Sequence, residues 1–184
     1  MTALQKGIKY LAMAFATVLA VAIIGGILSA TGLFSGLFAG DAVSEDMKTY
    51  SVTSEIHDLN ICINAADLYI KEGDTFLVES NLKHLKVEEK GGILTIEETK
   101  RFGGTYNGAV LTVYVPAGTV FDNTNLTTGA GRLTVETLSS GTLDFELGAG
   151  DVSVTSLIAT KTADIEGGAG RITISGGALR ELDL

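Results

Sequence analysis

The chain has 184 residues and a formal net charge of −9, with a single cysteine, a single proline and no tryptophan. The acidic balance argues against a nucleic-acid partner, because the phosphates of DNA or RNA would be repelled. A lone cysteine excludes an internal disulfide, and Cys62 alternates with apolar neighbours on the opposite parity, as expected of a small strand residue.

The N-terminal segment has the composition of a membrane anchor. Residues 1–10 contain Lys6 and Lys9 and no acid, and residues 11–39 contain no charged side chain at all. Since about 20 apolar residues cross a bilayer, we expect a transmembrane helix within 11–39. Its apolar run is longer than that of a signal peptide and no Ala-x-Ala site follows, which favours an uncleaved anchor. The lysines predict a cytosolic N-terminus and an extracellular C-terminal domain.

Small residues recur four positions apart in this segment, at Ala22, Gly26 and Ala30 and again at Gly32, Gly36 and Gly40. Such rows permit close helix packing, so self-association through the helix is a further hypothesis, although glycine and alanine are also simply common in membrane spans. Residues 40–54 are polar and predict a short linker, so that the folded domain would span 55–184.

Several short strands are expected after the linker. The alternating segments LNICIN, DLYI, TFLVES, LKHLKVEEK and ILTIEE each predict a strand, with a hairpin turn at Lys90-Gly91-Gly92. NAADLYI (64–70) resembles a degenerate copy of GAGDVSV (148–154), which suggests that the N-terminal half is an eroded part of the array that follows. AVLTVYVP (109–116) predicts a strand that ends at the only proline.

The C-terminal third repeats one pattern three times. Gly-Ala-Gly occurs at 129–131, 148–150 and 168–170, a period of 19 and then 20 residues, with apolar and polar residues alternating on both sides. Each repeat therefore predicts two short strands joined by a glycine corner, and stacked repeats would bury a continuous apolar ribbon. We expect an all-β, right-handed parallel β-helix-like solenoid, with a β-sandwich as the alternative. The structural corners are Gly129, Gly131, Gly148, Gly150, Gly168 and Gly170.

The order of these features resembles the bacterial putative-adhesin β-strand-repeat family. The segments that carry the resemblance are NAADLYIKEGDTFLVES, LKVEEKGGILTIEE, LTVYVPAGT and the Gly-x-Gly repeats, and together they cover about residues 52–184. The family is uncharacterised in function and often follows a single membrane anchor. The resemblance implies a surface-exposed β-solenoid and supplies no catalytic residues.

Acidic residues align before the corners and raise the question of a metal. In a parallel stack they would lie about 5 Å apart, where a divalent cation would relieve their repulsion. A solvated acidic face, tempered by Lys161, is the competing interpretation, because single carboxylates in a flat ladder do not enclose an ion. The hypothetical calcium ladder comprises Asp144, Asp164, Asp183, Glu146 and Glu166.

Other candidates are weaker. Arg132, Asp151 and Arg171 alternate in sign after successive corners, which predicts an ion-pair ladder between layers. His57 and His84 have no partner at catalytic spacing and are expected at the surface, and Asn125 heads a glycosylation sequon of a kind common by chance. We find no catalytic constellation and expect no cofactor.

The sequence thus predicts a non-enzymatic, membrane-anchored surface module that adheres to or binds an unknown surface polymer or protein. The alternative is a regulatory or envelope-stress signalling component that acts through its membrane helix or cytosolic tail. RELDL matches the strand before a corner but lacks the corner itself, so the natural chain is expected to continue past Leu184 or to pair with another molecule.

Overall fold

The computed structural model describes residues 42–99 and 106–183, which belong to one compact unit, Asp41–Leu184. The expected membrane segment at 11–39, with its small-residue rows, lies outside the described residues. Within the described part, no helix has the length and apolar character needed to cross a bilayer.

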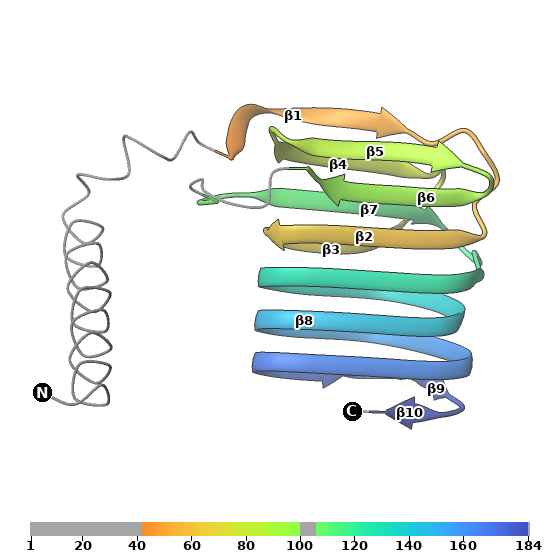
Figure 1. Ribbon diagram of the computed structural model, residues 1–184. Coiled ribbons are helices and arrows are strands. Elements are labelled where there is room, and N and C mark those ends of the chain that lie inside the picture. Colours follow the sequence, from red (N-terminus) through yellow and green to blue (C-terminus); the bar gives the residue numbers. More distant parts are fainter. Residues whose placement is uncertain (1–41, 100–105, 184) are drawn as a thin grey trace, which may run out of the picture. The chain divides into compact units, whose positions relative to one another are not determined.

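One sheet of ten strands makes up the domain (Figure 1). Along the sheet the order is β1-β4-β7-β3-β8-β2-β6-β5, and β9 and β10 both pair with β8. The strands are β1 (Val43–Ser51), β2 (Asp58–Ala65), β3 (Asp67–Gly73), β4 (Leu77–Leu82), β5 (Leu85–Lys90), β6 (Ile93–Glu98), β7 (Val110–Pro116), β8 (Phe121–Ile174), β9 (Gly177–Leu179) and β10 (Leu182–Asp183).

The long ribbon β8 carries the three repeats as three stacked layers. Its 54 residues run without interruption and wind through successive turns of a flattened coil (Figure 1). Alternation explains the winding, since inward-facing residues on both sides of each corner are apolar and fully buried, as Leu126 and Leu133 are in the first layer. The all-β, solenoid-like architecture expected from the 19–20-residue period is confirmed.

The layer above β8 is the degenerate repeat. β2 pairs in parallel with β8, with Ala65 opposite Ala130, and β3 pairs in parallel with β8, with Leu68 opposite Leu133. Asn64-Ala65-Ala66 therefore stacks on Gly129-Ala130-Gly131, which confirms that NAADLYI is an eroded corner and strand. A further layer follows, because β6 pairs in parallel with β2 and β7 pairs in parallel with β3.

The N-terminal end departs from a uniform parallel stack. β5 is antiparallel to β6, β4 is antiparallel to β7, and β1 is antiparallel to β4. The turn at Gly91-Gly92, with φ of +61° and +80°, reverses the chain and forms the expected hairpin between β5 and β6. Antiparallel strands thus close this end of the array.

Two expected boundaries were wrong. The polar segment expected as a linker contributes β1, because pairing with β4 satisfies its backbone even though most of its side chains are exposed. The single strand expected over 82–90 is two strands, since Lys83 and His84 form a turn between β4 and β5. Charged residues in both segments hid the alternation that marks buried strands elsewhere.

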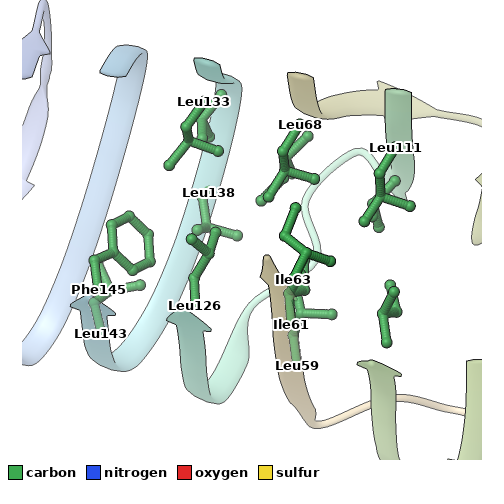
Figure 2. Packing of buried hydrophobic residues seen from close by; sticks show 14 of the residues in the cluster. Leu59, Ile61, Ile63, Leu68, Leu111, Leu126, Leu133, Leu138, Leu143 and Phe145 are labelled. Atoms are coloured by element: carbon green, nitrogen blue, oxygen red, sulfur yellow. The ribbon is translucent and has the colours of Figure 1, made fainter. Parts of the chain in front are cut away.

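The core fills the space inside the coil (Figure 2). Leu126, Leu138, Leu143 and Phe145 from β8 lie in line with Leu59, Ile61 and Ile63 from β2, and Leu133 lies in line with Leu68 and Leu111 (Figure 2). Phe121 and Phe145 are the largest fully buried side chains, at 1% exposure each. Columns of like residues therefore stack from layer to layer, as the aligned repeats require.

Candidate functional site

The glycine corners form a column at one edge of the coil. Gly131, Gly150 and Gly170, the last residue of each corner, have φ of +124°, +144° and +143°. A Cβ on Gly150 would overlap the carbonyl oxygen of Gly131, and a Cβ on Gly170 would overlap that of Gly150. Glycine is therefore required here both for its backbone conformation and for the close approach of successive corners.

The first glycine of each corner meets only the second of these requirements. Gly129, Gly148 and Gly168 lie outside the positive-φ region, yet a Cβ on each would overlap the carbonyl oxygen of the layer before it: Asn64, Gly129 and Gly148 respectively. The six glycines named from the sequence thus lie in one continuous line of bare backbone along the stack.

Two hollows flank this column. A shallow groove of about 520 Å³ runs along its outer side and is lined by Thr127, Glu146 and Glu166 together with the residues that follow each of them. A smaller pocket of about 260 Å³ lies on the inner side, between the corners and the apolar residues Leu133, Leu147, Val152 and Ile172. The groove presents carboxylate and peptide oxygens, and the pocket presents hydrocarbon.

Gly167 explains why the inner pocket exists. The residue directly before the corner is Thr128 in the first layer and Leu147 in the second, and each brings a side chain toward the coil. In the third layer this position is Gly167, so only Ile172 occupies the space that a side chain would fill. The sequence alignment contained this difference, but the corner glycines beside it concealed its meaning.

The acidic residues of the hypothetical calcium ladder lie on the outer face. Asp144, Asp164, Glu146 and Glu166 are exposed, and Asp183 pairs with Asp164 through the backbone of β10. Thr127 Oγ1 donates to Glu146 Oε2 at 3.4 Å. Within the described ranges no group of three or more acidic, histidine or cysteine residues has the arrangement of a metal site.

The predicted ion-pair ladder is wrong. Among residues 42–99 and 106–183, no ion pair joins Arg132, Asp151 and Arg171, whereas Lys86 and Glu88 do pair, at 2.7 Å. All three ladder residues are exposed beside the corners, where water solvates them and screening leaves little gain from pairing.

Neutral and carboxylate hydrogen bonds link the layers instead. Asn125 Nδ2 donates to Asn60 Oδ1 at 2.9 Å, and the backbone N–H groups of Asn123 and Arg132 donate to the carboxylates of Asp58 and Asp67 at 3.0 and 3.2 Å. These bonds join residues 65 positions apart and fix the register between β2, β3 and β8. As expected, His57, His84 and Cys62 are exposed.

A buried carboxylate at the degenerate corner was not foreseen. Glu98 is only 3% exposed; its Oε2 accepts from the backbone N–H of Asn64 at 3.0 Å and its Oε1 accepts from the hydroxyl of Tyr106 at 2.7 Å. Burial, reinforced by Glu98, raises the pKa of Tyr106 above its ordinary value of 10.0. Glu98 thus provides the acceptor that the eroded corner lacks. Its place at the end of an alternating strand was the only signal in the sequence.

Three solved structures are similar to the chain at low identity. A putative cell adhesion protein from Clostridium sporogenes is 11% identical and matches 74% of this chain and 97% of its own, with a TM-score of 0.44. A putative adhesin from Bacteroides fragilis is also 11% identical and matches 79% and 100%, with a TM-score of 0.33. A putative lipid binding protein from Parabacteroides distasonis, 11% identical, matches 73% of both chains at a TM-score of 0.33.

No curated protein matches the chain. The model of one domain family, however, matches residues 56–184, which is most of the sequence and includes every layer from β2 to β10. The match agrees with the resemblance to an uncharacterised β-strand-repeat family found in the sequence. The protein therefore belongs to the Toastrack DUF4097 family.

Proposed function

We propose that the protein is a non-enzymatic, membrane-anchored binding module of the cell surface, built on a right-handed β-solenoid, that binds a surface polymer along its corner groove. The observation that carries this proposal is the groove itself, about 520 Å³ in volume and lined by Thr127, Glu146 and Glu166 at one residue per layer. Layers repeat about 4.8 Å apart, so the groove is matched to an extended ligand.

The chemistry of the groove indicates what such a polymer would carry. Glu146 and Glu166 offer only acceptors when ionised, the corner glycines add peptide oxygens, and no basic residue lines the groove. A complementary ligand would present hydrogen-bond donors, as the hydroxyl and amine groups of a polysaccharide do. Hydrogen bonds to a carboxylate are among the strong ones, at about 1.5–3 kcal/mol each.

The anchor and the topology belong to the same proposal. The uncharged segment 11–39 and the preceding Lys6 and Lys9 support a single membrane span with a cytosolic N-terminus. The solenoid would then stand outside the cell, where polymers of the envelope and of neighbouring cells are accessible.

Protease protection tests the location. Intact cells carrying a tag after Leu184 would be treated with protease, and loss of the tag without lysis is the expected result. If the tag survives until lysis, and the domain proves cleavable once released, the solenoid lies inside the cell. The surface proposal would then fail, and regulation through the membrane helix or cytosolic tail would replace it.

Matched charge variants test the groove. The full chain in detergent would be titrated with soluble polysaccharides that carry hydroxyl and amine groups, including glucosamine oligomers. Loss of one charge-assisted bond corresponds to about tenfold in affinity, so Glu146→Gln with Glu166→Gln should weaken binding by roughly a hundredfold. Glu45→Gln with Asp46→Gln, which removes two exposed charges from β1, should leave it unchanged. Equal effects of the two pairs would refute the groove.

A further inference from the structure

The two ends of the array are finished differently. At the N-terminal end the outermost strands are β1 and β5, both antiparallel to their neighbours and both rich in exposed charge. Charged edge strands of this kind discourage pairing with another chain. The last full layer, formed by 159–174 of β8, has no such protection.

Only part of that last layer is covered. β9 pairs with Leu157–Ala159 and β10 pairs with Ala163 and Asp164. Beyond Asp164, no described residue pairs with the outer side of the segment 165–174, which includes the third glycine corner (Figure 1). This segment, called the open edge below, presents the same backbone surface that each inner layer offers to the next.

Apolar side chains at the open edge are exposed in proportion. Leu133, Val152 and Ile172 occupy one column in successive layers, and their exposure rises from 2% to 6% to 38%. Ile172 also borders the inner pocket of about 260 Å³. A further layer stacked on this one would bury Ile172 as the second layer buries Leu133, and would close the pocket.

Charge indicates which kind of chain fits. The described charged residues of the last layer and the segment after it are balanced, with three basic residues against four acidic ones, whereas the whole chain carries −9. An identical end brought face to face would thus meet both signs rather than a uniformly acidic surface. They are Lys161, Arg171, Arg180, Asp164, Glu166, Glu181 and Asp183.

We infer that the open edge is the docking site for a second copy of this chain, with the last layers of the two copies facing each other across a two-fold axis. A head-to-tail stack is blocked because the opposite end is closed by antiparallel strands, so only an isologous contact joins two open edges. The contact uses the end of the array, and it is independent of ligand binding along the groove.

Spin-label distances on the full chain test this arrangement. With Cys62→Ser, one label would be placed at Thr173→Cys on the last layer, and in a second sample at Met47→Cys on β1, both exposed positions. Since layers stack about 4.8 Å apart and strands extend about 3.3 Å per residue, labels on Thr173 should lie within roughly 30 Å of each other and those on Met47 roughly 60 Å apart. Absence of the short Thr173 distance at any protein concentration would overturn the inference.

Disrupting variants complete the test. Ile172→Asp should weaken the association at least tenfold, whereas Val120→Asp, an equally drastic change at a 59% exposed position away from the open edge, should not. If circular dichroism shows that Ile172→Asp alters the fold, Arg171→Glu with Arg180→Glu decides, because both side chains are exposed and the change makes each end strongly acidic. A short distance that persists at unchanged affinity in that variant contradicts the inference.

Discussion

Substitution of alanine in the glycine corners separates the two demands that this backbone makes. Gly148→Ala adds a methyl group where the carbonyl oxygen of Gly129 already lies, at a residue outside the positive-φ region. Gly150→Ala adds the same group against Gly131 at φ of +144°. Gly118→Ala, at φ of +79° with nothing within 4 Å, imposes the conformational demand alone.

The expected costs follow from these geometries. An L-residue held at positive φ costs roughly 1–2 kcal/mol, which is the whole effect expected at Gly118. Forcing two corners apart disturbs the stacking on both sides, and overpacking of this kind costs about 1–3 kcal/mol, which is the effect expected at Gly148. Gly150→Ala combines both terms, so we expect a loss of roughly 3–4 kcal/mol.

Urea unfolding followed by circular dichroism measures these differences. With a slope of about 1.5 kcal/mol per molar urea, Gly150→Ala should lower the midpoint by roughly 2 M and Gly118→Ala by less than about 1 M. Ala149→Ser, at the exposed middle of the same corner, is the control and should leave the midpoint unchanged. If Gly148→Ala is as stable as the parent chain, the layers do not stack through their corners and the reasoning is wrong.

Three other substitutions probe buried or bonded polar groups. Thr124→Val should stabilise the fold by about 1 kcal/mol in the same urea assay, because the buried Oγ1 has no partner among the described residues. Glu98→Gln should lower the pKa of Tyr106, read from phenolate absorbance, but leave it above 10.0 because burial persists. Hydrogen bonds from Ser54 lower the pKa of Glu89 below 4.5, so its contribution to stability is present above that pH and is lost as pH falls through the lowered pKa. Glu89→Gln should abolish this part of the pH dependence; an unchanged acid limb would contradict it.

Periodicity carried most of what could be predicted of the fold. Alternation and the recurrence of Gly-Ala-Gly fix which residues face the core, and the register Ala65–Ala130 follows from aligning the eroded corner with an intact one. The antiparallel end could not be predicted, because a strand does not encode the direction of a partner 30 or more residues away. β1 was missed since its side chains do not alternate in burial, and only its pairing with β4 makes it a strand.

The site was less accessible to sequence reasoning than the fold. Position in a repeat identified Glu146 and Glu166 as neighbours in a ladder, but whether a groove or a flat face surrounds them depends on how the corners protrude. The inner pocket arises from one residue, Gly167, whose effect appears only when Ile172 is seen to leave the space unfilled. The expected pairing of Arg132 with Asp151 failed because solvation of exposed charges is not visible in spacing.

The layer formed by β2 and β3 has a consequence for how the chain reaches this structure. Its neighbours on both sides, β6 with β7 and the first turn of β8, come later in the chain, so neither edge is covered when the layer itself leaves the ribosome. The first half of the domain must therefore wait until about residue 136 before any layer has both neighbours. From there each further 19–20 residues adds onto a finished template. Protection by a chaperone or by the translocation machinery is thus needed mainly early in synthesis, before the array has begun to extend itself.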